Sequence, residues 1–584
     1  MKNKATEKTG APSPAPIGRE QIRRANETLS RYRRGKADLD RRIVENEQWY
    51  RLRHWSRMGD KPREVQPASA WLFNVIASKY ADAMENYPAP QIFPREESDV
   101  PAAELLTQVI PVLLTLCDFE QVYADVSLYR LKNGTGVYGV FWDPEKAGGA
   151  GDVSIRKADL LNLFWEPGVS DIQRSPQLFY TTLADNDRLL REYPFLEGAL
   201  GGAEAAGPLY DDGVDRTNKS TVVEWYYKKR LPGGGERLHY AKYVNETLLY
   251  ASENDEALSE RGWYDHGEYP FVFDTLYAVE GSPAGFGYID IGKSAQQYVD
   301  RANQAILENL LANARPRHFI SMTGSVNEAE YADITQDFVH VDGQLGQDSI
   351  LPIEGKTLSD VYLRVLDGKI EELKETTGNR DSTTGGAPGG VTAASAIAAL
   401  QEAGGKLSRN DARSAYRAYR RVITQMIELI RQFYTLPRCL RITGEDGAGA
   451  FIRFSNEPLL PREQTRFGVS LGQHTPVFDI EVAASKADPY TRLSRNDLAM
   501  RLYQAGFFEP ERAGQALACL QRMDFDRKHF VENAIRRNAA GAGGAAPAET
   551  GLPLPPRPRE PEPLSAAAIG ATGAAAAAKA VRGG

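Results

Sequence analysis

The chain has 584 residues, enough for several structural units, and with 42% hydrophobic and 25% charged residues its composition is that of an ordinary globular protein. A net charge of −8 argues against a protein that grips nucleic acid tightly, because basic residues that neutralise phosphates supply most of that affinity. We expect no membrane span, no secretory signal, no metal and no cofactor. Apolar runs are short, and the three cysteines and seven histidines are scattered without ligand spacing.

Helical patterns dominate the first quarter of the chain. Residues 1–17 are polar and contain proline, so we expect them to be disordered, within a flexible and charged segment that extends to residue 39. Apolar periodicity predicts helices over about 19–74, 72–87 and 102–131. Pro88 is expected to end the second helix, and Pro111 is expected to break or kink the third.

Strand patterns follow. Short runs rich in β-branched and aromatic residues predict strands at 136–143, 152–158 and 161–167. After a Gly/Ala/Asp-rich loop at 199–218, turn signals separate further runs between 221 and 252, which indicates a β-meander, and 269–279 reads as one more strand.

Long helices distinguish the next part. An apolar stripe predicts a helix over 291–314, about 36 Å long, which Pro316 closes. A strand-rich insert separates it from a second predicted helix at 358–375. The Gly/Thr-rich stretch 376–395 precedes a third helical pattern at 392–434, with a hinge expected at Gly404 and Gly405.

The last part of the chain returns to strands between 438 and 482 and then to short helices within 489–537. Beyond residue 538 the chain is rich in Ala, Gly and Pro, so we expect disorder there. The predicted fold class is therefore α+β.

The stretch GYIDIGKS, Gly287–Ser294, matches the phosphate-binding pattern G-x-x-x-x-G-K-[ST]. The bulky residues Tyr288, Ile289 and Ile291 resist the positive φ angles that a phosphate nest needs, and long helices rather than alternating βα units follow. We therefore favour a helix start. A P-loop NTPase of the packaging-motor type remains the alternative.

Three other patterns are weaker candidates for a binding or catalytic site. Gly134, Gly136 and Gly139 imitate a dinucleotide fingerprint, but they lie between a helix and a strand in the reverse order, so we expect a turn. YDHGE at 264–268 and VHVD at 339–342 bring carboxylates near a histidine, and we interpret them as a polar turn and a strand end.

A basic stripe of Arg409, Arg413, Arg417, Arg420 and Arg421 recurs at helical spacing. It is either a DNA-facing surface or, as we favour, a solvated or intersubunit face paired with carboxylates.

The order of these parts resembles the portal, or head–tail connector, protein of tailed bacteriophages. The stretches that carry the resemblance are NEQWY, NGTGVYGVFWDPEKAGGAGDVSI, LFWEPGVSD, the transition YPFVF to GSPAGFGYIDIGKSAQQYVDRANQ, and TTGGAPGGVTAASAIAALQEA. Each motif alone is loose, but their succession over about residues 40–537 is fairly specific. The resemblance implies a ring-forming fold with a mixed α/β wing, a two-helix stem, a small β-rich clip, a long kinked helix and a helical crown.

The resemblance also implies where each part lies in the chain. In chain order it assigns 40–286 to the wing, 287–314 to stem helix 1, 315–356 to the clip, 357–377 to stem helix 2, 378–391 to the tunnel loop, 392–436 to the long helix, 437–488 to return strands of the wing, and 489–537 to the crown. Residues 538–584 have no secure counterpart.

Function follows from the same resemblance. Copies of the chain, usually about twelve, would form a ring at one capsid vertex, through which double-stranded DNA is packaged and ejected, and would not act as an enzyme. Partners would be the terminase large subunit, head–tail adaptor proteins and the major capsid and scaffold proteins. Assembly would take place in the host cytoplasm.

The expected sites fall in three groups. The tunnel loop comprises Asn379, Arg380, Asp381, Ser382, Thr383, Thr384, Gly385 and Gly386. Stem residues expected to line the channel are Lys293, Gln296, Asp300 and Gln304, and clip residues expected to bind terminase or adaptors are Arg317, His318, Asp342 and Gln344. A neutral or acidic lining would let DNA slide, because it grips no phosphate strongly. A non-portal scaffold protein with a coiled coil is a further alternative, but the long helix shows no sustained heptad.

Overall fold

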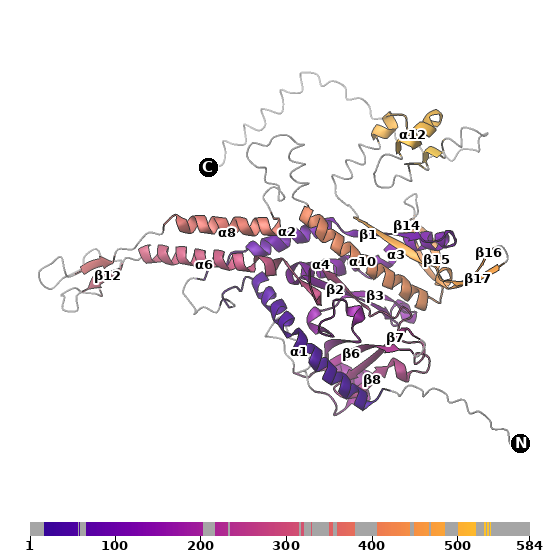
Figure 1. Ribbon diagram of the computed structural model, residues 1–584, viewed down its shortest axis with the longest axis horizontal. Helices are drawn as coiled ribbons and strands as arrows, with labels where there is room; N and C mark the ends of the chain where they lie inside the picture. Colours follow the sequence, from indigo (N-terminus) through magenta and orange to yellow (C-terminus); the bar gives the residue numbers. More distant parts are fainter. Residues whose placement is uncertain are drawn as a thin grey trace, which may run out of the picture. The chain divides into compact units, whose positions relative to one another are not determined.

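The structure is a computed structural model (Figure 1). It describes residues 17–56, 58, 66–201, 217–231, 234–314, 317–320, 329, 350–353, 359–379, 406–443, 449–466, 469–484, 500–520, 531, 532, 534–536 and 538. The chain divides into two compact units, Met1–Lys486 and Ala487–Gly584. Helices and strands alternate irregularly along the chain, which confirms the predicted α+β class.

Two helices open the described chain. α1 (Arg19–Tyr50) buries an apolar stripe that begins with Ile22, Ala25 and Leu29, and most of its arginines are exposed. The prediction of one helical region up to residue 74 is wrong in part, because α1 ends at Tyr50 and α2 (Trp71–Glu85) begins anew.

The predicted break at Pro111 is wrong. α3 (Val100–Leu116) runs through Pro111, and the chain turns instead at Asp118, whose φ of 52° is left-handed, before α4 (Phe119–Asn133) begins. By length and composition alone, the segment Glu97–Leu116 is apolar enough to cross a membrane, contrary to the expectation from the sequence. Core helices pass the same test, and α3 buries its apolar residues, among them Leu106 and Ile110, in the main hydrophobic core.

Two antiparallel sheets form the centre of the first unit. β2 (Thr135–Asp143) lies between β3 (Asp152–Lys157) and β9 (Phe271–Thr275). The larger sheet has five strands in sequential order, which confirms the predicted meander. Its strands are β4 (Leu163–Trp165), β5 (Gln177–Asp185), β6 (Lys219–Arg230), β7 (Glu236–Val244) and β8 (Thr247–Ala251), and α5 (Asn186–Glu192) follows β5.

One pairing joins distant parts of the chain. β1 (Pro88–Pro94) pairs antiparallel with β18 (Phe478–Ala484), with Ile92 opposite Ile480. Pro88 does end the helical pattern before it, but the sequence PAPQIFP gave no strand signal, because proline lacks the amide hydrogen that a ladder uses. An edge-type strand between prolines was therefore missed.

The long helices occur as predicted. α6 (Tyr288–Ala314) and α8 (Val361–Thr377) lie side by side and extend from the two sheets, and β12 (Arg317–Ile320) pairs with β13 (Ile350–Ile353) beyond their outer ends (Figure 1). α10 (Lys406–Phe433) packs across β9 and β2. The hinge expected at Gly404 and Gly405 lies outside the described residues.

The remaining strands form ribbons. β10 (Tyr277–Val279) pairs with β11 (Ser282–Phe286), β14 (Arg438–Thr443) with β15 (Gly449–Phe454), and β16 (Arg462–Arg466) with β17 (Val469–His474). One large core joins α3, α4 and α10 to the three-stranded sheet. In the second unit, α12 (Ala513–Leu520) packs its buried Ala516 and Leu520 against Ile535.

Candidate functional site

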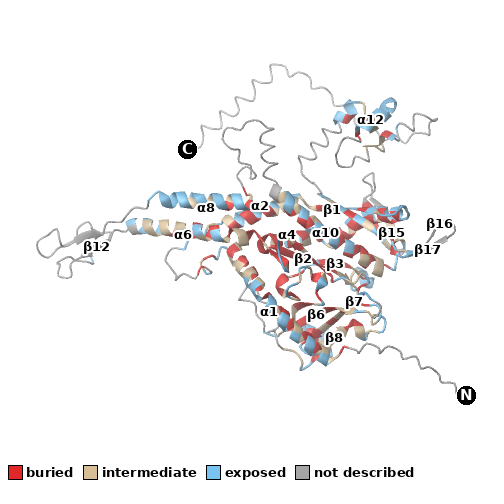
Figure 2. Ribbon diagram, in the orientation of Figure 1, coloured by how far each residue is buried: buried red, intermediate tan, exposed pale blue. Residues whose placement is uncertain are grey.

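The α6–α8 helix pair is the most distinctive surface feature of the first unit. Figure 2 shows α8 exposed along most of its length, whereas the sheets and α10 contain many buried residues. Large apolar side chains stand in solvent on both helices: Tyr298 is 58% exposed, Leu310 62%, Val361 59% and Val365 53%. Helix faces this apolar are normally covered by protein, so the pair has the surface of an interface.

The start of α6 is fixed by a buried network rather than by a loop. The amide of Gly287 donates to Asp290 Oδ2 over 2.9 Å, and Asn46 of α1 donates to Asp290 Oδ1 over 3.0 Å. Tyr288, which is buried, donates its hydroxyl to Asp411 Oδ2 of α10 over 2.5 Å. A carboxylate in the first turn complements the helix dipole. The place where a bound anion would sit is therefore already occupied by Asp290.

This geometry does not make a phosphate nest. β11 ends at Phe286, directly before Gly287, so a strand does precede the motif more closely than expected. Tyr288–Gly292 are already helical, however, and their amides point along the helix instead of cradling a ligand. Lys293 Nζ binds Glu45 Oε1 of α1 over 3.0 Å. The favoured interpretation of Gly287–Ser294 as a helix start is confirmed.

A second buried network holds the middle of α6. Asp300 accepts hydrogen bonds from the Ser69 amide over 2.9 Å and from Gln296 Nε2 over 3.0 Å. His54 Nδ1 lies 2.5 Å from Asp300 Oδ2, and its Nε2 lies 3.0 Å from the Trp49 carbonyl oxygen. Both ring nitrogens thus face oxygen atoms of the same chain, which holds the ring in one orientation.

These contacts correct the expected channel lining. Gln296 and Asp300 have no exposed surface and Gln304 has 5%, so their side chains face the interior of the chain and not a channel. Lys293 is half-buried in its ion pair with Glu45. The polar residues of α6 recur at helical spacing, which is also the pattern of a solvent-exposed face. In the structure they instead contact α1 and the segment between α1 and α2.

The close approach of α6 and α2 depends on one glycine. A Cβ built on Gly292 would lie 2.6 Å from Leu72 Cδ2, and Leu72 is itself buried. Leu373 of α8 lies 3.6 Å from the same position. Gly292 thus lets three helices meet where the pair leaves the sheets.

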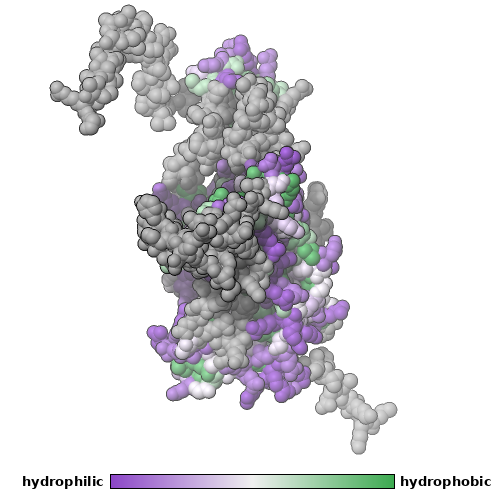
Figure 3. Space-filling model, turned by 90° about the vertical axis from the view of Figure 1, so that its left-hand side faces the viewer, coloured by the Kyte–Doolittle hydropathy of each residue, from purple (hydrophilic) through white to green (hydrophobic). Residues whose placement is uncertain are grey.

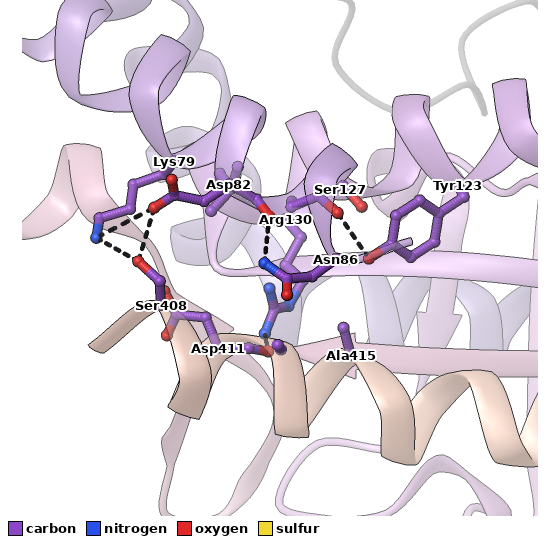
Figure 4. A pocket seen from close by; sticks show the side chains of 12 residues that line it. Lys79, Asp82, Asn86, Tyr123, Ser127, Arg130, Ser408, Asp411 and Ala415 are labelled. Atoms are coloured by element: carbon purple, nitrogen blue, oxygen red, sulfur yellow. Dashed lines mark hydrogen bonds and ion pairs between the residues drawn. The ribbon is translucent and has the colours of Figure 1, made fainter. Parts of the chain in front are cut away.

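The joint between α2, α4 and α10 contains a small polar cavity (Figure 4). Its volume is about 20 Å³, room for a single water among polar groups. Ser408 of α10 donates to Asp82 over 2.7 Å and accepts from Lys79 over 3.1 Å. Arg130 Nη2 donates to the Asp411 carbonyl oxygen over 2.9 Å. These contacts fix the first turn of α10.

Buried charges lie beside this cavity. Arg130 Nε is 2.7 Å from Asp274 Oδ1, although the two groups are not aligned as a hydrogen bond, and both side chains are almost fully buried. Burial raises the pKa of Asp274 and of Asp411 above the usual value for aspartate. No sequence signal pointed to this cluster, because its members are separated by more than a hundred residues. Its role is to hold elements together.

The arginine stripe lies on the solvent side of α10. Arg409, Arg413, Arg417, Arg420 and Arg421 are all exposed, and the buried apolar residues of α10 lie on the opposite side. Within the described residues, Arg413, Arg417 and Arg420 form no ion pair, so the expected pairing with carboxylates is not found for them inside one chain.

The glycine and histidine patterns have structural roles, as expected. Gly134 ends α4 with a φ of 85°, and its Cβ position would lie 2.2 Å from the backbone of Phe286. His266 Nδ1 accepts the Glu268 amide over 3.0 Å in a polar turn, and burial lowers the pKa of His266 to about 4. The strand end at 339–342 lies outside the described residues.

The other expected site residues are only partly described. Arg317 and His318 lie in β12, and Asn379 follows α8 with a buried side chain whose Oδ1 has no hydrogen-bond partner within the described residues. Arg380, Asp381, Ser382, Thr383, Thr384, Gly385 and Gly386, as well as Asp342 and Gln344, lie outside the described residues. Their assignment stays a prediction.

The model of a family described as phage P22-like portal protein matches residues 26–581. No curated protein matches the chain.

Proposed function

Because the chain belongs to the phage P22-like portal protein family, we propose that copies of it form a closed ring whose channel passes double-stranded DNA during packaging and ejection. Family membership makes it a bacteriophage protein of the capsid vertex that serves genome packaging. The portal family is structural, and we propose that the energy for packaging comes from a separate ATPase.

The observation that carries this proposal is the exposed apolar surface of α6 and α8. Tyr298, Leu310, Val361 and Val365 are exposed even though α6 and α8 pack against each other and α6 packs against α1, α2 and α4. In a ring, the helix pair of each copy packs against that of its neighbour, which removes this surface from water. Figure 3 views the molecule from the side on which α6 and α8 extend in Figure 1 and shows a described surface that is largely hydrophilic, with scattered apolar side chains.

The parts of the ring follow the order of the chain. α6 and α8 form the stem, the β12–β13 pair belongs to the clip, and the sheets with α10 form the wing. The buried networks around Asp290 and Asp300 hold the stem rigidly to the wing. We place the tunnel loop at 378–391, where Gly, Thr and Ser give a permissive backbone that shifts with a moving duplex. The short helices of 489–537 are assigned to the crown.

Partners meet the ring at its two ends. The clip, with Arg317, His318, Asp342 and Gln344, is proposed to dock the terminase large subunit during packaging and head–tail adaptors afterwards. Major capsid and scaffold proteins contact the ring during its assembly in the host cytoplasm. The P-loop alternative loses its main support, because the motif residues form the first turns of α6.

Negative-stain electron microscopy of the purified chain tests this proposal. We expect annular particles with a central hole, and no ATP hydrolysis above that of a buffer control. Particles that stay monomeric across protein concentrations and salt concentrations would contradict the ring. ATP hydrolysis that is lost in Lys293→Ala would instead support the NTPase.

A further inference from the structure

Two helices of the chain expose charged side chains that form no close ion pair within the described residues, although Arg417 and Arg420 act at longer range on Asp274 and Asp479. On α10, Arg413, Arg417 and Arg420 lie on one face at spacings of about one turn. All three are exposed, and none of them has an ion-pair partner within the described residues. This surface, the α10 arginine stripe, carries a strong local positive charge on a chain whose net charge is −8.

The outer face of α8 carries two carboxylates, with the exposed Arg364 one turn before them. Asp367 and Glu371 are exposed and one turn apart, and neither has an ion-pair partner within the described part of the chain. The buried Leu373 and Thr377 lie on the side of α8 that faces α6. Asp367 and Glu371 form the α8 acidic face. Their spacing equals that of Arg413 and Arg417.

A closed ring gives each chain two different neighbours, so one patch on a copy meets a different patch on the next copy. We propose that the α10 arginine stripe of one copy contacts the α8 acidic face of the adjacent copy. This inference rests on the proposed ring and names the charged part of its interface. Arginine suits such a contact, because its guanidinium binds carboxylates in a bidentate manner.

Apolar residues support the same contact. Val361, Leu363 and Val365 are exposed on α8 within two helical turns of Asp367. A neighbouring copy that covers this helix buries apolar area, which supplies affinity, while the charge pairs fix the register and the direction of the ring. A contact of this kind accounts for both unsatisfied surfaces at once.

A DNA duplex is the other polyanion that could meet the α10 arginine stripe. A bound duplex would explain the arginines but would leave Asp367 and Glu371 without partners. The phosphates of the duplex would also repel these two carboxylates. The chain as a whole also lacks the basic excess of proteins that grip phosphates. The observations therefore favour a second copy of the chain.

Charge reversal tests the pairing. One variant carries Arg413→Glu and Arg417→Glu, and a second carries Asp367→Arg and Glu371→Arg. Each variant alone brings like charges together at every interface of a ring, so we expect its ring population to fall by about tenfold or more at fixed protein concentration. Far-UV circular dichroism checks that each variant is folded, and mass photometry counts the rings.

Mixing the two variants is the decisive step. In an equimolar mixture, alternating copies place opposite charges at every interface, so rings should return. Native mass spectrometry should find equal numbers of both variants in each ring. A single chain that carries all four changes should also form rings. The control, Arg23→Glu with Arg34→Glu on exposed positions of α1, changes the net charge equally and should leave rings intact.

Each other outcome has a clear meaning. Rings of the first variant at the wild-type level would overturn the pairing. If that variant also lost salt-dependent retention of a 30-base-pair duplex probe, about three helical turns, the partner of the arginines would be DNA. A folded mixture without rings would overturn the pairing too. Wild-type chain without rings would contradict the proposed function itself.

Discussion

His54 Nδ1 lies 2.5 Å from Asp300 Oδ2, and neither side chain has any exposed surface. This contact joins the segment after α1 to the middle of α6, across 246 positions of sequence. It fixes how the helix pair leaves the rest of the first unit, and the first prediction concerns its strength.

Asp300→Ala should destabilise the chain strongly. The change removes the acceptor of the Ser69 amide and one acceptor of Gln296 Nε2, and it leaves His54 Nδ1 without its partner in the interior. Breaking a buried pair by removing one member costs about 3–5 kcal/mol. The free energy of unfolding from urea denaturation should fall by about that amount, whereas the exposed Glu104→Ala on α3 should change it by no more than about 0.5 kcal/mol. Equal midpoints for both variants would contradict a stabilising role of the network.

Replacing each of two glycines of the helix pair by alanine should change the stability of the chain in opposite directions. Gly292→Ala places a Cβ 2.6 Å from the buried Leu72 and should destabilise by about 1–3 kcal/mol. Gly368 on α8 has open space around its Cβ position, so Gly368→Ala should stabilise the helix by about 1 kcal/mol. Thermal unfolding followed by circular dichroism measures both. A stabilising Gly292→Ala would show that α2 and α6 do not pack as closely as described.

Stability should fall on acidification because of His266. Burial lowers its pKa to about 4, and its Nε2 has no partner within the described residues. The unfolded chain has an ordinary histidine pKa of about 6.5 and therefore binds a proton more readily than the folded chain below that pH. Neutral His266 therefore contributes to the free energy of unfolding above about pH 6.5, and this contribution is lost as the pH falls towards 4.

The variant His266→Asn isolates this effect. Its stability relative to wild type should rise between pH 6.5 and 4 by up to about 3 kcal/mol, because asparagine does not titrate. Urea unfolding at a series of pH values provides the measurement. A difference that stays constant over this window would mean that His266 is protonated equally in both states.

Lys293→Ala should change little. The ion pair with Glu45 is only half-buried, and pairs of that kind contribute about 0–1 kcal/mol. Isothermal titration with Mg-ATP should give no binding signal for wild type or variant, because the surrounding residues form a helix. A wild-type signal that disappears in the variant would reverse the interpretation of the motif.

Deletion of residues 380–390 should separate assembly from DNA handling. The segment follows α8 and precedes α10, and neither the exposed apolar residues of α6 nor those of α8 belong to it. Rings should therefore form normally in negative stain, whereas capsids that carry the variant should package or retain less DNA. Loss of rings would mean that this loop takes part in subunit contact.

Periodicity predicted the elements that carry a regular apolar stripe. α6, α8 and the β6–β7–β8 meander occur close to their expected ranges, and α10 occupies the described part of its range, because burial of one face leaves a repeat in the sequence. The failures have a common physical origin. Gln296 and Asp300 are polar residues at helical spacing, a pattern that a solvent-exposed helix face shows equally. Only their contacts with the distant residues His54 and Ser69 reveal that they are buried. Likewise β1 is a strand because of β18, not because of its own residues.

The pairing of β1 with β18 has a consequence for synthesis on the ribosome. Pro88 lies opposite Ala484, so the strand that follows α2 waits for nearly four hundred further residues before its partner emerges. Contacts of such sequence separation form late and slowly. During that interval the nascent chain exposes the unpaired edge of β1, which favours aggregation. Translation that stops before residue 478 would leave a product with the helix pair complete and this edge permanently open, a natural substrate for chaperones and proteases.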